Sequence, residues 1–231
     1  MNTEQKWPSH VVIVRHGQSE RNVEKKKAHD AGAHSYGPGL RDMDTPLTRV
    51  GHEQSIITGT RLNHDHKFDV VFVSPYRRTR ETADDLIEQF SHKPRMVSEE
   101  RIREIEFGIL DGFTTAGIKA KYPDEHERRK REGKYWYRPP GGESRPDVAL
   151  RVHSFLGTLT RDYRKKSVLI VCHSVVVLIF RRLLERWNED DYMKIDKEDD
   201  VKNCGVTTYH CDAKHNKLAL DYYNRTFYPE P

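Results

Sequence analysis

The sequence predicts an α/β fold, a three-layer α/β/α sandwich on a mostly parallel sheet, with an antiparallel edge or hairpin near the C-terminus. Three short runs, Val11–Val14, Val70–Val73 and Val168–Val171, are apolar at every position, which is typical of strands covered on both faces. Segments with helical periodicity alternate with these runs, as expected for a parallel sheet with helices on both sides. A chain of 231 residues fits a single domain over residues 1–231.

The elements follow in chain order. Apolar residues recur at helical spacing after the second run and again before the third, so both segments are predicted to be amphipathic helices. They are Ala83, Leu86, Ile87 and Phe90 in the first segment, and Val148, Val152, Phe155, Leu156, Leu159 and Tyr163 in the second. Two later segments, 205–211 and 218–223, flank a polar turn and are predicted to form the hairpin or antiparallel edge.

Two tracts lack a regular pattern, residues 23–46 and residues 131–147, and the second contains Pro139-Pro140-Gly141-Gly142. Long irregular connections in a compact domain are often functional. We therefore expect both tracts to be loops that border a site.

The charge balance disfavours a nucleic-acid partner. The chain has 40 Lys and Arg against 36 Asp and Glu, a net charge of +4, and the two signs are interspersed. Nucleic-acid binding needs cations gathered on one face. The basic runs Lys25–Lys27 and Arg128–Arg131 are interpreted as solvated surface.

The cysteines indicate a reduced, cytoplasmic protein. Their number is odd and Cys172, Cys204 and Cys211 have no zinc-type spacing, so we expect neither a disulfide framework nor a metal site. Cys172 lies in an apolar run and is expected to be buried. The N-terminal residues lack an apolar signal core, and no run approaches the ~20 apolar residues of a membrane span. No membrane partner is expected.

Polar residues follow each apolar run where the strand ends. Arg15 and His16 follow the first, Ser74 and the arginines after it follow the second, and His173 follows the third. In open parallel sheets, ligands bind beyond the carboxyl ends of the strands. The sequence therefore predicts a site with two histidines and several arginines at one sheet edge, suited to an anion.

Five segments in order resemble the motifs of the histidine phosphatase superfamily, also called the phosphoglycerate mutase-like family. They are RHGQSERN (15–22), DTPLTRVGHEQ (44–54), SPYRRTRETA (74–83), REIEFGILDG (103–112) and VLIVCHSVVV (168–177). Together they span most of the chain, and their order is that of the family. The resemblance implies an enzyme that acts on phosphorylated substrates without a cofactor.

By this resemblance, His16 is the nucleophile and forms a phosphohistidine. An imidazole, with a pKa of ~6.5, supplies a neutral nucleophile near physiological pH. Arg15 and Arg78 match the phosphate-clamping arginines, and a guanidinium fork suits phosphate oxygens. His173 matches the second histidine, which stabilises the transferring phosphoryl group. Spacing selects Arg78 over its neighbours Arg77 and Arg80, which are interpreted as surface or substrate contacts.

The proton donor is implied to be Glu104. Glu106 is a rival, because residues two apart on an extended segment face the same way and periodicity cannot choose between them; the family spacing favours Glu104. Ser19 and Asn22 are expected to add neutral donors to the phosphate. A helix starting near Gly17 would point its positive end at the same place. Ser174 replaces the commoner glycine after the second histidine, and could cap the helix that follows.

Two activities compete within the resemblance. Glu104 and His173 are 69 positions apart, which is short for a phosphoglycerate mutase. The tract from Tyr135 to Ser144 looks like the P-P-G-G-E-S loop of the phosphatase branch. A short loop admits water to the phosphohistidine, whereas a mutase must exclude it. We therefore favour a phosphatase for phosphate monoesters, with a 2,3-bisphosphoglycerate-dependent mutase as the alternative and an inactive relative that binds phosphorylated ligands as a second.

The expected partner is a small phosphorylated molecule, a sugar phosphate or another organophosphate, and a phosphoprotein also fits. The segment 23–43 is long for the family and carries a set of basic residues, Lys25, Lys26, Lys27, His29, His34 and Arg41. We hypothesise that it forms a cationic rim selecting substrates with a second anionic group; the alternative is a loop that merely tolerates insertion.

Overall fold

The computed structural model describes residues 5–37 and 39–229, and within them a six-stranded sheet has the strand order β3-β2-β4-β1-β5-β6. The strands are β1 (His10–Arg15), β2 (Val70–Val73), β3 (Arg95–Ser98), β4 (Ser167–Cys172), β5 (Val206–Asp212) and β6 (Lys217–Arg225). The first four are mutually parallel. Strand β5 is antiparallel to β1 and to β6. The predicted mixed sheet with an antiparallel C-terminal hairpin is confirmed.

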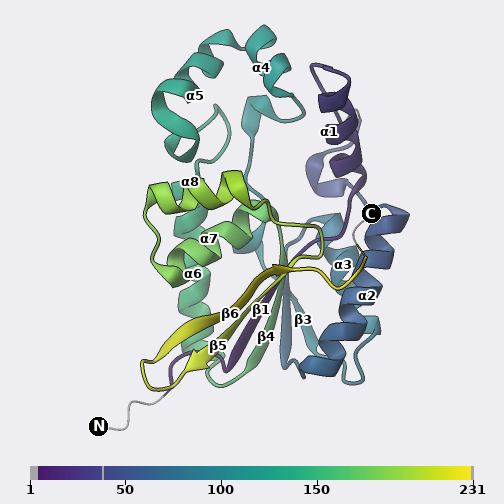
Figure 1. The fold of residues 1–231 in the computed structure, drawn as a ribbon, viewed down its shortest axis with the longest axis vertical. Coiled ribbons are helices and arrows are strands. Elements are labelled where there is room, and N and C mark those ends of the chain that lie inside the picture. The colour runs from purple at the N-terminus through teal and green to yellow at the C-terminus, as the bar shows by residue number, and fades with distance from the viewer. Residues whose placement is uncertain (1–4, 38, 230–231) are drawn as a thin grey trace.

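Helices cover both faces of the sheet (Figure 1). One layer holds α2 (Arg49–Asp65) and α3 (Arg77–Glu88). The other holds α6 (Arg145–Asp162), α7 (Ser174–Glu185) and, beside α7, α8 (Glu189–Glu198). The predicted helices after the second strand and before the third correspond to α3 and α6. The three-layer sandwich is therefore confirmed.

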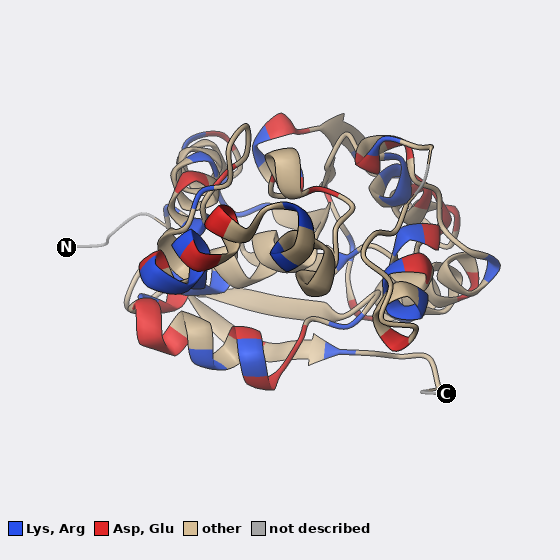
Figure 2. Ribbon diagram, turned by 90° about the horizontal axis from the view of Figure 1, so that it is seen from above, with Lys and Arg blue, Asp and Glu red and all other residues tan. Residues whose placement is uncertain are grey.

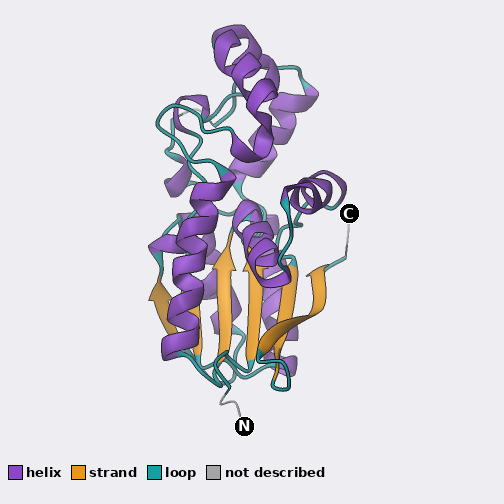
Figure 3. Ribbon diagram, turned by 90° about the vertical axis from the view of Figure 1, so that its left-hand side faces the viewer, coloured by secondary structure: helices purple, strands orange, loops and turns teal. Residues whose placement is uncertain are grey.

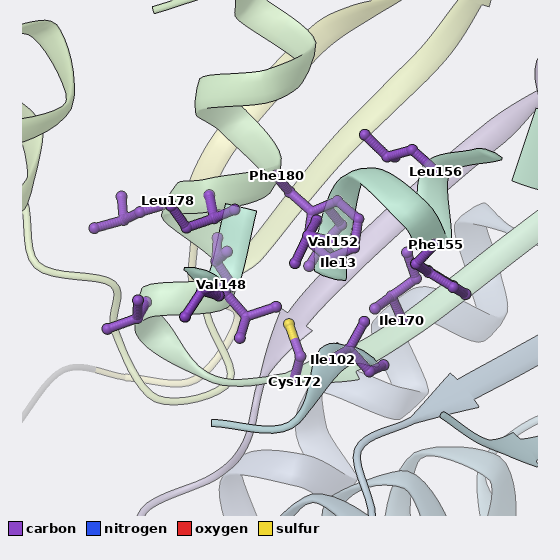
Figure 4. Packing of buried hydrophobic residues seen from close by; sticks show 14 of the residues in the cluster. Ile13, Ile102, Val148, Val152, Phe155, Leu156, Ile170, Cys172, Leu178 and Phe180 are labelled. Carbon is purple, nitrogen blue, oxygen red and sulfur yellow. The ribbon is translucent and has the colours of Figure 1, made fainter. Parts of the chain in front are cut away.

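The sheet separates the core into two clusters, and alternate residues of each central strand belong to different clusters. Val11 and Ile13 pack with α6 and α7, whereas Val12 and Val14 pack with α2 and α3. Figure 4 shows the first of these clusters, where side chains of α6 meet Ile13, Ile170 and Cys172. Successive side chains of a strand point to opposite faces of the sheet. A strand with helices packed on both faces must therefore be apolar at every position. This explains the unbroken apolar runs, and the burial of Cys172 is confirmed.

Three helices stand beyond the carboxyl ends of the parallel strands. They are α1 (Glu20–Asp30), α4 (Thr115–Lys121) and α5 (Pro123–Trp136). Figures 1 and 3 show α4 and α5 at the top of the molecule, above the edge toward which the parallel strands run. Three one-turn 3-10 helices lie in the connections, η1 (Asp42–Asp44), η2 (Glu100–Ile102) and η3 (Gly108–Leu110).

The prediction that 23–46 and 131–147 are loops is wrong in part. Most of α1 and all of η1 fall in the first tract, while the second overlaps the end of α5 and the start of α6. The helices in these tracts are polar, since α1 buries only Ala28 and α5 only Tyr135. A helix without an apolar stripe leaves no periodic signal.

Helix α2 and strand β3 also lack an apolar pattern. Helix α2 packs through small residues: a Cβ on Gly59 would lie 2.9 Å from the Cα of Leu86 in α3. Strand β3 is an exposed edge of the sheet and is largely polar. Their positions depend on contacts with the rest of the fold.

Charges of both signs are interspersed over the helices in Figure 2. Within Arg128–Arg131, Arg128 pairs with Glu125 and Glu132, and Lys130 pairs with Glu127. Arg129 instead lines a cavity. Across the part of the chain that the structure describes, no helix combines the length and the apolar character that crossing a bilayer requires.

Candidate active site

The carboxyl ends of β1, β2 and β4 bring the expected residues to one cavity. It has a volume of about 110 Å³, and Arg15, His16, Arg78 and Glu104 are among the residues that line it. His173 adjoins it, with its ring centroid 5.3 Å from that of His16. Arg15, His16 and His173 lie at the ends of buried strands and Arg78 lies in the first turn of α3, whereas Glu104 comes from the irregular segment between η2 and η3.

Hydrogen bonds determine which nitrogen of His16 faces the cavity. Its Nδ1 lies 2.7 Å from the carbonyl oxygen of Gly17, which can only accept, so Nδ1 carries the proton. Arg78 Nε donates to Nε2 at 3.2 Å, which requires a lone pair there. Burial, together with the charges of Arg78 and Arg15, holds the pKa of His16 well below its usual value. The ring is therefore a neutral imidazole with Nε2 toward the cavity.

Gly17, which follows this histidine, must be a glycine. A Cβ at this position would lie 2.5 Å from the carbonyl oxygen of Gly51 at the start of α2. The close approach of the two backbones holds the turn after β1 against α2, and with it the His16 ring.

His173 is fully buried and has one free nitrogen. Its Nε2 lies 2.7 Å from Ser74 Oγ, at the end of β2. Its Nδ1 has no hydrogen-bond partner and lies 4.0 Å from Glu104 Oε2. Burial lowers the pKa of His173 well below its usual value, so the ring is neutral. A buried polar atom without a partner is costly, which makes Nδ1 available to a ligand oxygen.

The two arginines are held differently. Arg15 donates through one terminal nitrogen to the Val201 carbonyl, and its Nε is buried without a partner. Arg78 is held on its outer side by Asp42, which accepts from Nη1 at 3.0 Å and from Nη2 at 3.1 Å. Its Nε remains directed at His16.

Asp42 is the main residue that the sequence analysis missed. It lies on η1 and also pairs with Arg21, at 3.0 Å. Arg21 in turn pairs with Asp111. No motif marks Asp42, because its partner Arg78 is brought to it only by the tertiary fold. Ser74 was quoted within the second arginine motif, but its contact with His173 was not foreseen.

The structure separates Glu104 from Glu106. Glu104 is 8% exposed, lines the cavity, and its pKa is raised, chiefly by burial. Glu106 lies outside the cavity, where it accepts a hydrogen bond from the Tyr76 hydroxyl at 3.1 Å. The segment is irregular, so the two side chains do not share a face.

Ser19 and Asn22 both line the cavity, but they serve helix α1 first. Ser19 is its N-cap, and Asn22 Oδ1 accepts from the Ser19 backbone N–H at 3.1 Å. Helix α1 therefore begins at Glu20, and the expected start near Gly17 is wrong. Asn203, which the sequence analysis did not single out, donates to Asn22 at 3.2 Å and to the His16 carbonyl at 3.1 Å.

Three further expectations concern the helix starts. Ser174 is the first residue of α7, and its N-cap is His173, so the proposed capping by Ser174 is wrong. Arg77 is exposed and pairs with Glu81. Arg80 is exposed as well, and neither arginine is among the residues that line the cavity.

The donor set suits an oxyanion. Arg15, which lines the cavity, and His173, which adjoins it, each have a buried nitrogen without a hydrogen-bond partner, and the imidazole of His16 is neutral. Among residues 5–37 and 39–229, no group of three or more His, Cys, Asp or Glu side chains is placed to hold a metal ion. The arrangement can bind a tetrahedral anion beside an imidazole nitrogen and a buried carboxyl group whose pKa is raised.

The chain belongs to the histidine phosphatase superfamily (branch 1), whose family model matches residues 11–224. It is 30% identical over 227 residues to the phosphoglycerate mutase-like protein AT74H of Arabidopsis thaliana, covering 88% of this chain and 74% of that protein. It is 31% identical over 171 residues to phosphoserine phosphatase 1 of Hydrogenobacter thermophilus, covering 71% of each.

A solved structure also resembles it over nearly the whole length. The mycobacterial glucosyl-3-phosphoglycerate phosphatase in complex with VO3 superposes with a TM-score of 0.71 at 25% identity, covering 94% of this chain and 100% of that one. The family membership supports a phosphatase or phosphotransferase activity.

Proposed function

We propose that this protein hydrolyses phosphate monoesters through a phosphohistidine on His16. The observation that carries the proposal is the His16 geometry: a neutral ring with its Nε2 lone pair in a cavity that also holds two guanidinium groups. The guanidinium groups neutralise the charge of the phosphoryl oxygens, and the lone pair of Nε2 then attacks phosphorus.

In the first step, Nε2 of His16 bonds to phosphorus as the bond to the ester oxygen breaks. Glu104 donates its proton to that oxygen, which leaves as an alcohol. In the second step, a water oxygen attacks phosphorus, the P–N bond breaks, and Glu104 takes the proton back. Inorganic phosphate leaves and His16 is again neutral. Arg15, Arg78 and His173 hold the phosphoryl oxygens in both steps. Ser19 and Asn22 line the same cavity beside them.

The short connection before α6 favours hydrolysis, whose second step needs water, over a mutase reaction. Only a short loop, 137–144, connects α5 to α6, so little chain is available to seal the cavity against water. Relatives with both kinds of name match the chain, a phosphoserine phosphatase and a phosphoglycerate mutase-like protein. The mutase is thus the alternative, and it requires a dependence on 2,3-bisphosphoglycerate.

The test is to trap the intermediate. The protein is mixed with a ³²P-labelled alkyl phosphate, quenched in alkali, and the labelled peptide is mapped. We expect acid-labile label on His16 and release of inorganic phosphate, both abolished in His16→Ala and retained in the exposed control His153→Ala. Label on another residue, or turnover by His16→Ala, contradicts the mechanism. Phosphate transfer to 3-phosphoglycerate without net release identifies the mutase instead, and binding without label the inactive relative.

A further inference from the structure

A second cavity adjoins the proposed phosphate site. It has a volume of about 200 Å³ and shares Lys25, Tyr36 and Phe107 with the first. Helices α1, α4 and α5 and the first residue of α6 contribute to its walls. A ligand phosphate beside His16 would therefore have its organic part directed into this second space.

Two arginines, Arg129 and Arg145, line the second cavity without an ion-pair partner among the described residues. Arg145 is 8% exposed, and its Nε is buried with no hydrogen-bond partner. Burial and the nearby charge of Arg145 lower the pKa of Arg129. Two guanidinium groups at one cavity, one of them buried, repel each other, and an anion between them would relieve this repulsion.

The acid in this cavity does not neutralise them. Glu143 accepts from Arg103 at 2.9 Å and from Arg151 at 3.1 Å, so its charge is already balanced. Lys25 adds a further positive charge at the boundary between the two cavities. The second cavity thus has an excess of positive charge.

Between the cationic ends the walls are apolar or aromatic. Phe107, Phe113 and Tyr36 line this stretch. Tyr137 also contributes its ring, because its hydroxyl group donates to Glu125 at 2.6 Å. Such walls suit a short organic spacer and offer it few hydrogen bonds.

We propose that Arg129 and Arg145 form a subsite for a second anionic group of the substrate. The preferred substrates are then phosphate monoesters that carry a carboxylate or a second phosphate across a short, partly apolar spacer. This inference rests on the proposed function, since it places the first phosphate beside His16. Guanidinium groups bind both kinds of oxyanion through paired hydrogen bonds.

Two basic residues of the segment 23–43, Lys25 and His29, line the second cavity, as the rim hypothesis requires. Of the three consecutive lysines, only Lys25 lines either cavity, and Lys26 pairs with Asp30 on the surface of α1. The cations that would select the substrate come mainly from α5 and α6, which are far away in the sequence.

The test compares matched substrates and matched variants. The substrates are phenyl phosphate, 4-carboxyphenyl phosphate and a series of ω-carboxyalkyl and ω-phosphoalkyl phosphates of increasing length. We expect Arg129→Gln and Arg145→Gln each to lower kcat/KM about tenfold or more for the best doubly anionic substrate, from the loss of a charge-assisted hydrogen bond. Turnover of phenyl phosphate should change less than twofold. The control Arg131→Gln removes an exposed arginine from the same helix and should alter neither.

Equal losses on phenyl phosphate and on the doubly anionic compounds, or no loss on either, would overturn the subsite. The carboxylate and phosphate series show which second anion is preferred. If wild type turns over none of these compounds, the proposed function fails. The subsite is then tested by calorimetric titration with the corresponding phosphonates. We expect the dissociation constants of the variants to exceed that of wild type by the same factor. Arg145→Lys should recover part of the affinity if charge, rather than packing of α6, is responsible.

Discussion

At the scale of single residues, burial separates groups that are chemically alike. The protein has 13 histidines, but in His16 two directed hydrogen bonds place the proton on Nδ1 and the lone pair on Nε2, which accepts from Arg78. Glu104 and Glu106 differ in the same way: the first is enclosed, whereas the second is exposed and accepts a hydrogen bond from the hydroxyl group of Tyr76. Enclosure lowers the pKa of the imidazole and raises that of the carboxyl group, which are the directions that a nucleophile and a proton donor require.

These shifts predict a bell-shaped pH profile for kcat/KM on alkyl phosphates. As the pH falls through the lowered pKa of His16, the imidazole gains a proton and the nucleophile is lost. As the pH rises through the raised pKa of Glu104, the carboxyl group loses the proton that the leaving oxygen needs. Activity should therefore be highest between these two values, and a profile without the alkaline limb would contradict the assignment of Glu104.

Glu104→Gln should remove the alkaline limb and lower kcat/KM for glycerol phosphate by roughly 10²–10⁴-fold. The loss should be much smaller for p-nitrophenyl phosphate, whose leaving group needs little protonation. Glu106→Gln is the matched control and should change either value less than threefold. A greater loss in Glu106→Gln would exchange the two roles.

At the scale of elements, tight backbone contacts join the segments around the site. The segment that carries Glu104 ends in η3, and Gly108 at its start has φ = +54°. A Cβ there would lie 2.1 Å from the Pro140 carbonyl oxygen, so only glycine lets this segment meet the loop 139–142. The Glu104 segment and the loop before α6 are in this way held as one unit.

Gly108→Ala should therefore cost more stability than a glycine replacement that adds backbone strain alone. We expect about 1–2 kcal/mol from the left-handed φ and a further loss from the clash, together with a lower kcat/KM. Gly32→Ala is the control, because its φ is +62° and a Cβ there would meet nothing within 4 Å. Urea unfolding and steady-state kinetics measure both effects; equal losses in the two variants would show that the contact with Pro140 is unimportant.

At the scale of the whole molecule, the site depends on a core that covers both faces of the sheet. The site residues come from several strand ends and connections, so their relative positions depend on how the layers pack. Helix α6 contributes to the second cavity and to the core. It begins at Arg145, which lines that cavity, and it buries Val152, Phe155 and Leu159 against the sheet.

Leu159→Ala should lower the free energy of unfolding by about 2–5 kcal/mol, as a cavity-forming change at a fully buried position. Leu150→Ala is the same substitution on the same helix at a side chain that is 73% exposed, and should change stability by less than about 0.5 kcal/mol. Urea unfolding of both variants measures the difference. Similar values for the two would contradict the assignment of this face of α6 to the core.

The sequence by itself determined the fold class, the three central strands, helices α3 and α6, and the C-terminal hairpin. These elements carry their own periodicity because each buries an apolar face. It also marked His16, Arg78, Glu104 and His173 by local motifs. Only the tertiary structure decided that Glu104 rather than Glu106 is enclosed, that Asp42 holds Arg78, and that Arg129 and Arg145 line one cavity. The physical reason is that such contacts join polar residues from different segments, and a polar side chain has no periodic signal to show which partner the fold will bring to it.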